Sequence, residues 1–585
     1  MTATWLILAC TLGDAPAAPP PIAIDFAMDS DPRIDTFTTT KVFSEKYLPL
    51  WLQALDRPEA DLQRLAADSI ARTHQGKYAR MDKAIPALLR VLTAPQTESV
   101  PRFCAARGLI VLDAKETAPQ LWQVAQGGGL ELRQLVEPAL ARWKYEPAYD
   151  VWRKRLTDRQ TRHRERMLAI RCLSEIADPA APQLLLAIVV DFHQAEAERL
   201  AAAQAAGKIK TSGLENEARK LASAQAKVID RLCAVGLLEH HSSEASRTLL
   251  LSLAVDPEPS VASAALRRLN ALDTSLVLPL AEKSLQDADS GTRREGARCY
   301  AANPTLERIA ALGKLLDDPV LSLRALVREE LRRLAHDSQW SDAVRKSAME
   351  SLQAESWRGQ EQAALLLADL DHKPAAPLLV KLLDSTRGEV MIASAWALRK
   401  LAVRETLPPM LEKASQLTEV RLRLKNSFAP LDHQAAHLFE AMGMMRYSPA
   451  IPLMERHIAK NLMMGEYSRS AAIWSLGLLH LGKPNEAMAT AITQRVTEPS
   501  SAIPVELTRV RLAGSIALGR MKAKSQAAAL RAFASIPVPD RLYMTIRWSL
   551  TELTGEELPY PENALETQGG WFLEPLDAPN PSISK

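Results

Sequence analysis

Hydrophobic and polar residues follow a helical period along most of the chain. In residues 260–287, SVASAALRRLNALDTSLVLPLAEKSLQD, apolar residues recur at helical spacing in two short runs. This spacing places the apolar residues on one face of each of two amphipathic helices, which a tight turn joins. Copies of the pattern recur along the chain, and no catalytic residue type occupies the recurring positions.

Two markers locate the copies. The first is a proline that opens the outer helix of a pair, where its missing N–H would have no partner. It occurs at Pro86, Pro119, Pro147, Pro182, Pro279, Pro377, Pro408 and Pro452. The second is an alanine pair in the inner helix, where small residues let helices approach closely. It occurs at 66–67, 105–106, 264–265, 363–364, 435–436 and 471–472. Where marks fall in adjacent repeats, as at 66–67 and 105–106 or at 435–436 and 471–472, they lie about 30–40 residues apart, which predicts an all-α fold, an α-solenoid of two-helix repeats.

The repeats also resemble a known family. Residues 318–327, DPVLSLRALV, and 388–398, GEVMIASAWAL, are similar to the D-x-x-x-V-R-x-x-A-A-x-x-L pattern of HEAT repeats. They are most similar to the bacterial, phycobilin-lyase-like subtype, and the resemblance covers roughly residues 43–554. It implies a right-handed superhelix of stacked helical hairpins. It implies little about function, because the family pattern consists of packing residues.

The N-terminus bears on the cellular compartment. Residues 5–13 are apolar, and Ala15-Pro16-Ala17 has the small-x-small pattern of a signal-peptidase site. We therefore interpret 1–17 as a possible signal peptide and expect a periplasmic or secreted protein, with a cytoplasmic one as the alternative. A lipid anchor at Cys10 is a further alternative. The apolar run is too short to cross a bilayer, so no integral membrane segment is expected.

The remaining boundaries follow changes in composition. Residues 18–40 are rich in Pro, Asp and Thr and are predicted to be a flexible linker. Repeats are expected over 41–190 and 232–554. The Ala-rich stretch 191–231 between them is predicted to project as a pair of lengthened helices around a Gly207–Gly213 turn, with one elongated repeat that has a mobile loop as the alternative. Residues 555–585 form an acidic tail, in which 571–573 (Trp-Phe-Leu) are expected to pack on the final repeat.

Composition and motifs argue against an enzyme. The net charge of +3 does not indicate nucleic acid as a partner, and the five cysteines show no C-x-x-C spacing for zinc or dithiol chemistry. His433, His437 and Glu440 share a helical face and could ligate a metal, but this pattern alone is weak and packing is the preferred interpretation. We find no P-loop, GxSxG or HExxH motif. No catalytic, cofactor-binding or metal-binding residue is therefore predicted.

The positions of the arginines indicate where neighbouring repeats contact each other and where a partner could bind. Those that precede the alanine marks are expected to pair with turn aspartates between repeats: Arg64, Arg102, Arg294, Arg324, Arg469 and Arg509. Residues 142–171 are strongly basic with interspersed aromatics, and are either a partner-binding surface or a solvated helix face whose arginines pair with acidic residues of the next repeat. The candidate partner-binding residues are Arg153, Lys154, Arg155, Arg159, Arg162, Arg164 and Arg166.

The predicted function is a non-enzymatic scaffold that binds unknown protein partners along the concave surface of its inner helices. One alternative is a lyase-like or chaperone-like factor that acts on a cofactor-bearing partner, as the family subtype implies. The other is a nucleic-acid-binding protein that uses the basic face 142–171.

Overall fold

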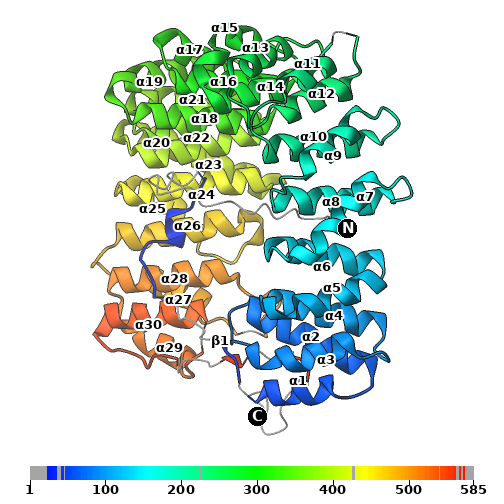
Figure 1. Cartoon of the computed structure of the whole chain (residues 1–585). Helices are drawn as coiled ribbons and strands as arrows, with labels where there is room; N and C mark the ends of the chain where they lie inside the picture. The colour runs from blue at the N-terminus through cyan, green and yellow to red at the C-terminus, as the bar shows by residue number, and fades with distance from the viewer. Residues whose placement is uncertain are drawn as a thin grey trace. The chain divides into compact units, whose positions relative to one another are not determined.

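The chain forms thirty α-helices, α1 to α30, in the residues that its structure, a computed structural model, describes (Figure 1). These are residues 23–35, 41–44, 46–223, 225–424, 428–499, 501–538, 540–561, 566–567 and 571–573. The predicted all-α fold is confirmed. Contacts divide the chain into two compact units, and the boundary at 303/304 lies inside the predicted repeat region 232–554.

Unit 2 consists of residues 37–303 and 561–585. Its helices are α1 (Tyr47–Leu55), α2 (Ala60–Gln75), α3 (Ile85–Thr93), α4 (Ser99–Val111), α5 (Ala118–Gly127), α6 (Leu130–Arg142), α7 (Tyr149–Thr157), α8 (His163–Glu175), α9 (Ala181–Val190), α10 (Glu196–Ile209), α11 (Glu215–Leu221), α12 (Val228–Leu237), α13 (Glu244–Leu253), α14 (Pro259–Leu272), α15 (Leu278–Leu285) and α16 (Ser290–Ala302). Two strands of two residues each, β1 (Lys41–Val42) and β2 (Glu566–Thr567), form a parallel pair in this unit.

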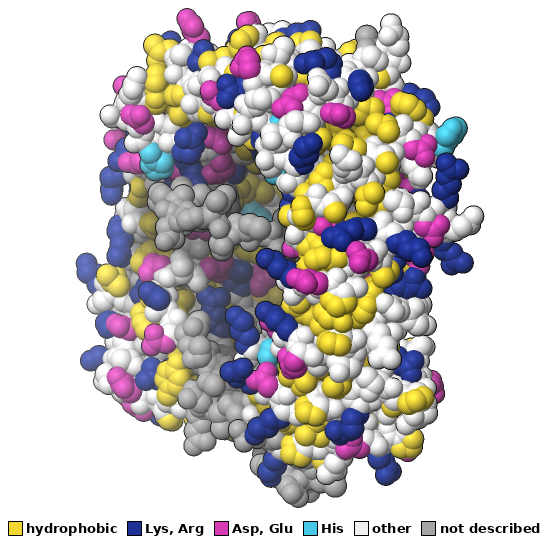
Figure 2. Space-filling view, viewed as in Figure 1, with side chains coloured by type: hydrophobic (Ala, Val, Ile, Leu, Met, Phe, Trp, Pro, Cys, Tyr) yellow, Lys and Arg dark blue, Asp and Glu magenta, His cyan; other side chains and the backbone are white. Residues whose placement is uncertain are grey.

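Unit 1 consists of residues 1–36 and 304–560. Its helices are α17 (Leu306–Lys314), α18 (Leu321–Ala335), α19 (Ser338–Gln353), α20 (Trp357–Asp369), α21 (Ala376–Leu382), α22 (Gly388–Leu401), α23 (Leu407–Leu424), α24 (Ala429–Met444), α25 (Ile451–Glu455), α26 (Glu466–Leu479), α27 (Glu486–Val496), α28 (Thr508–Met521), α29 (Ala527–Phe533) and α30 (Arg541–Thr554). The even-numbered helices α20 to α30 pack against one another in order, each as the second helix of a hairpin. Lys, Arg, Asp and Glu side chains are mixed over the visible surface of both units (Figure 2).

The two sequence markers have the structural roles that their chemistry predicts. Pro86, Pro182 and Pro377 lie in the first turn of α3, α9 and α21, the first helices of their hairpins. The alanine marks are buried in second helices, for example Ala66, Ala106, Ala364, Ala436 and Ala472, all fully inaccessible. Neighbouring second helices approach so closely that a Cβ built on Gly477 of α26 would lie 2.6 Å from Cα of Ala517 of α28. Small residues are therefore required between these helices.

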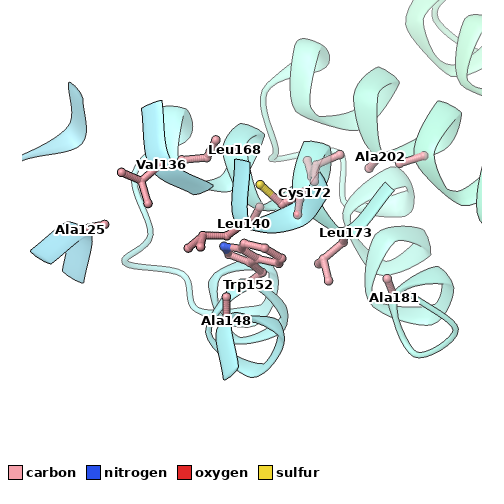
Figure 3. Close-up of a cluster of buried hydrophobic side chains, with 14 of the residues drawn as sticks. Ala125, Val136, Leu140, Ala148, Trp152, Leu168, Cys172, Leu173, Ala181 and Ala202 are labelled. Carbon is pink, nitrogen blue, oxygen red and sulfur yellow. The ribbon is translucent and has the colours of Figure 1, made fainter. Parts of the chain in front are cut away.

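The layers between hairpins are filled by larger side chains. In unit 2 the indole of Trp152, from α7, lies between Leu140 of α6 and Cys172 and Leu173 of α8, and is fully buried (Figure 3). Its Nε1 donates to Oε2 of the buried Glu137 at 3.0 Å. The indole nitrogen, which is shielded from water, thus has a hydrogen-bond partner. Cys172 is a free buried thiol that packs as a small apolar residue.

The stretch 191–231 does not project as a pair of lengthened helices, which corrects that prediction. Gly207 lies inside α10 rather than in a turn, and α10 packs on α8, α9 and α12. A Cβ at Gly207 would lie 2.4 Å from the carbonyl oxygen of Gly236 in α12. Alanines such as Ala202 and Ala206 are fully buried. The small residues allow close helix packing, so the stretch belongs to the repeat stack: it supplies α10, the second helix of one hairpin, and α11, the first helix of the next. The alternative of one elongated repeat is therefore also wrong.

The C-terminal tail packs on the first repeat, which corrects the prediction that it packs on the last. Trp571 is 8% exposed and lies among the rings of Phe43, Trp51 and Tyr78, with centroid separations of 5.7 to 6.0 Å. Nε1 of Trp51 donates to the carbonyl oxygen of Phe572 at 2.5 Å. An aromatic pocket at α1 and α2 thus buries Trp571, whose ring would be costly to leave in water.

The predicted signal peptide 1–17 and Cys10 lie outside the described residues. Within the part of the chain that the structure describes, every helix is too short or too polar to span a membrane.

Candidate protein-binding site

Residues 23–35, here called the N-terminal segment, lie along the second helices of unit 1. The segment is seen in Figure 1 as the dark-blue stretch across α26. It contains one short 3-10 helix, Ala27–Asp29, and contacts α22, α24, α26, α28 and α30. The sequence predicts a flexible linker over 18–40. The described part of that stretch is instead bound to the repeats, because its carboxylates and apolar side chains match groups on the helices.

Asp25 binds the end of α22. Its Oδ1 accepts hydrogen bonds from Nε1 of Trp396 and from Arg399, both at 2.7 Å, and Arg399 also donates to the Asp25 carbonyl oxygen at 2.7 Å. Burial opposes the charge of Asp25, but these donors and the cations Arg399 and Lys400 outweigh it and lower the pKa of the carboxyl. Asp25 is therefore ionised at neutral pH and held as an anion.

Phe26 forms an aromatic cluster with α24 and α26. Its ring stacks on the imidazole of His437, with centroids 4.5 Å apart and planes inclined by 10°. The rings of His433 and Tyr467 approach Phe26 at 5.5 and 4.7 Å. Burial lowers the pKa of both histidines, although Glu440 opposes the shift at His437. The neutral rings can then pack as aromatic side chains beneath Phe26.

Met28 is the most deeply inserted residue of the segment, with 6% of its surface exposed. Its backbone N–H donates to Oε1 of Glu440 at 2.9 Å, and Oε2 of Glu440 lies 3.0 Å from Arg399. Both side chains of this ion pair are buried. Glu440 thus has partners in the segment and in α22. Among the described residues, no group of three His, Cys, Asp or Glu side chains has the arrangement of a metal site.

Asp29 connects the segment to the last two second helices. Its carboxylate forms an ion pair with Arg509 at the start of α28, and its carbonyl oxygen accepts from Arg541 of α30 at 2.7 Å. Arg509 also lies over the ring of Tyr467, 4.5 Å from its centroid. The sequence predicts that Arg509 pairs with a turn aspartate between repeats. Its partner is instead an aspartate from the opposite end of the chain.

Asp31 makes the final set of contacts. Its carboxylate lies 2.7 Å from the guanidinium of Arg520 in α28, and its carbonyl oxygen accepts from Nε1 of Trp474 in α26 at 2.6 Å. The guanidinium of Arg520 also stacks over the Trp474 ring at 4.9 Å. Burial lowers the pKa of Arg520, and Asp31 opposes that shift. Asp31 therefore compensates a partly desolvated cation.

Together these groups form what we call the segment-binding face of unit 1. It comprises Trp396, Arg399, His433, His437, Glu440, Tyr467, Trp474, Arg509, Arg520 and Arg541. Sequence reasoning noted the histidine face but missed its aromatic partner. The available signal was Trp396, between two alanines, and Trp474, beside the alanine mark 471–472, combined with the Asp-Phe pair at 25–26.

The structure assigns three of the seven predicted partner-binding residues to packing within unit 2. Arg153 donates two hydrogen bonds of 2.7 Å to the two carboxylate oxygens of Asp178, and these bonds raise the pKa of its guanidinium. Arg155 pairs with the buried Glu137 at 2.7 Å. Arg166 is buried; it pairs with Glu198 at 2.9 Å and donates to backbone carbonyls. These arginines hold neighbouring repeats together.

The other four predicted residues are exposed: Lys154, Arg159, Arg162 and Arg164. They lie in or near the turn between α7 and α8, and Lys and Arg side chains gather at the matching right-hand edge of Figure 2. This smaller basic surface stays a predicted contact region.

Known proteins resemble the chain in structure and not in sequence. No family model matches it, and no curated protein matches it. The solved structure of Kap95p, whose binding induces the switch loops of RanGDP to adopt the GTP-bound conformation, is 12% identical, with a TM-score of 0.52 over 87% of this chain and 72% of that chain. Importin beta is also 12% identical, with a TM-score of 0.49 over 86% and 72%.

The match to Kap95p defines the class of fold. The chain has the fold of an α-solenoid of HEAT-like helical hairpins, as the resemblance of residues 318–327 and 388–398 to HEAT repeats implies. At this level of identity the similarity concerns the fold alone. The bacterial, phycobilin-lyase-like subtype stays an expectation from the sequence.

Proposed function

We propose that the chain is a non-enzymatic protein-interaction scaffold whose segment-binding face holds extended acidic protein segments. The observation that carries the proposal is the N-terminal segment itself, which lies across five successive hairpins of unit 1 and contacts each through its second helix. A face that binds one extended segment along its length has the donors, cations and aromatic surface to bind others.

The chemistry of the face favours a peptide over a small molecule or a metal. Donors from Trp396, Trp474 and Arg541 point at backbone or carboxylate oxygens spaced along an extended chain. Cations at Arg509 and Arg520 face two different aspartates. Groups spread along a surface in this way bind an extended acidic segment, and they do not enclose a compact ligand.

The fold supports the same proposal. Stacked helical repeats present long surfaces, which suits them to binding partners over many small contacts. Kap95p, which shares the fold, binds RanGDP. We extend to this chain only the general role of a protein-binding scaffold, and the predicted export would place its partners in the periplasm or outside the cell.

Binding of a peptide in trans tests the function. The full-length chain would carry Phe26→Ala, Asp29→Asn and Asp31→Asn, which weaken its own segment, and a fluorescent peptide of residues 23–35 would be the probe. We expect saturable binding in fluorescence anisotropy, and its loss when Arg509→Gln and Arg520→Gln are added. These arginines pair with segment aspartates, so replacing them should leave the helices folded. A folded chain that binds no peptide would contradict the proposal.

A further inference from the structure

The N-terminal segment resembles a bound ligand more than a part of the core. Only Met28 is buried, whereas the carboxylate side chains of Asp25, Asp29 and Asp31 are 51%, 39% and 57% exposed. The segment also comes from the opposite end of the chain, since the residues with which it forms these hydrogen bonds lie more than 370 positions later. A segment held by half-exposed polar contacts can exchange with another of the same chemistry.

We infer that residues 23–35 are a built-in competitor for the segment-binding face, and that the protein partner of this face carries a segment of the same chemistry. This rests on the proposed function and adds the nature of the partner and the regulation of its access. The segment to be recognised has a carboxylate directly before an aromatic ring, an apolar side chain two positions after the ring, and carboxylates three and five positions after it. These are the places of Asp25, Phe26, Met28, Asp29 and Asp31.

Charge is the first element of this recognition. Residues 23–35 contain four aspartates and one arginine, a net charge of 1 − 4 = −3. The face presents Arg399, Arg509, Arg520 and Arg541 to them, and among the described groups that contact the segment only Glu440 adds a negative charge. Opposite potentials of this kind select acidic partners and disfavour basic ones.

The ring at Phe26 supplies specificity that charge alone does not. It covers the fully buried His437 and meets His433 and Tyr467 edge-on or tilted. An aliphatic residue in its place would lose the stacked geometry, and a polar one would leave the imidazole ring without its apolar cover. The partner segment therefore requires an aromatic residue at this position.

The covalent link makes the competitor effective. A tethered segment acts at an effective concentration on the order of millimolar, so a free peptide of equal intrinsic affinity competes poorly at micromolar concentrations. The face is then closed to acidic segments that bind weakly, and it is open to a partner that binds more tightly or that displaces residues 23–35. Access to the face is thus set by the chain's own N-terminus.

A competition experiment tests the inference on full-length chains. The labelled peptide 23–35 would be titrated into the wild-type chain, into the chain with Phe26→Ala, Asp29→Asn and Asp31→Asn, and into a Ser30→Ala control. Ser30 is exposed, and its hydroxyl bonds only to the carbonyl of Ala27 within the segment. We expect the weakened chain to bind the peptide at least about 10-fold more tightly than the wild type and the control, and a peptide with alanine at position 26 to bind about 10-fold more weakly, a factor of ten being 1.4 kcal/mol.

The outcomes separate the two proposals. Equal affinity of the wild-type and weakened chains for the peptide would overturn cis competition and leave the proposed function intact. Equal affinity for the native peptide and the one altered at position 26 would overturn the required aromatic. Absence of saturable binding to the weakened chain, with unchanged circular dichroism, would overturn the proposed function itself.

Discussion

The second helices of unit 1 and unit 2 share their packing residues but differ at other positions. In unit 1 these positions hold Trp396, His437, Trp474 and Arg520, and the N-terminal segment covers them. In unit 2 the corresponding helices α10, α12 and α14 border a pocket of 580 Å³. Its lining includes Leu200, Gln204, Ser260, Ser263, Ala264 and Arg267.

The difference shows that fold and recognition depend on separate sets of positions. Buried alanines, leucines and opening prolines recur in both units and produce the same hairpins. Large aromatic and cationic side chains occur where unit 1 binds its segment. The contrast between the two units can be tested by substitutions in each, from the largest expected effect to the smallest.

The largest effect is expected in unit 1, at the buried pair of Arg469 and Glu506. The two side chains are fully buried and form two hydrogen bonds of 2.8 and 2.9 Å. Arg469→Met leaves a buried carboxylate without its partner and should destabilise unit 1 by about 3–5 kcal/mol. Chemical denaturation measures the loss, and the double variant with Glu506→Leu should recover most of it. A single variant as stable as the wild type would refute this account of the pair.

Unit 2 should respond most to loss of its C-terminal tail. Trp571→Ala empties the aromatic pocket at α1 and α2 and should cost about 3 kcal/mol, as for other buried aromatic residues. Leu573, which is 39% exposed, provides the matched control, because Leu573→Ala should change stability by less than about 0.5 kcal/mol. Differential scanning calorimetry compares the two variants. Similar melting temperatures for both would mean that the tail does not stabilise the first repeat.

The sequence was sufficient to predict the hairpins, because prolines at helix starts and alanines between helices are local signals. It could not predict the destinations of the two chain ends. Trp571 packs on a helix more than 500 residues earlier, and Asp29 on one more than 450 residues later. Such pairings depend on the folded surface and produce no periodic pattern in the sequence. For the same reason the sequence could indicate that arginines of 142–171 pair with acidic residues of the next repeat, but not that Arg153 pairs with Asp178 and Arg166 with Glu198.

Acid should weaken unit 1 through its buried histidines. Burial lowers the pKa of His457 to about 4, and Arg421, Arg456 and Arg469 act in the same direction, while a hydrogen bond to the Leu453 carbonyl opposes it. The unfolded chain takes up a proton below pH 6.5 and the folded chain does not, so stability falls as the pH drops from 6.5 towards 4. The loss at pH 5.5 is about 1.4 kcal/mol for a neutral buried histidine.

Hydrogen exchange at pH 7.0 and 5.5, corrected for the intrinsic rates, checks this prediction in each unit separately. The His457→Gln variant should be less sensitive to pH in α24 and α26 than the wild type, whatever its absolute stability. An unchanged pH dependence would show that His457 is not the group that titrates.

The smallest effect on stability is expected at the exposed basic surface of unit 2. Replacing Lys154, Arg159, Arg162 and Arg164 by Glu should change the melting temperature little, since exposed sites contribute less than about 0.5 kcal/mol each. Arg153→Glu should be strongly destabilising, because it places a carboxylate against the buried Asp178. Binding of a polyanion such as heparin then tests the surface. Equal binding by the wild-type and fourfold variant chains would remove this surface as an interaction site.

The most direct test of the central claim is the exchange rate of the Met28 amide in the full-length chain. This N–H donates to the buried Glu440 when the segment occupies the face. We predict exchange at least about 10-fold slower than in the free peptide of residues 23–35, because opening against 1.4 kcal/mol gives that factor. The protection should disappear with Phe26→Ala, Asp29→Asn and Asp31→Asn. Exchange at the rate of the free peptide in the wild-type chain would contradict binding of the N-terminal segment to unit 1.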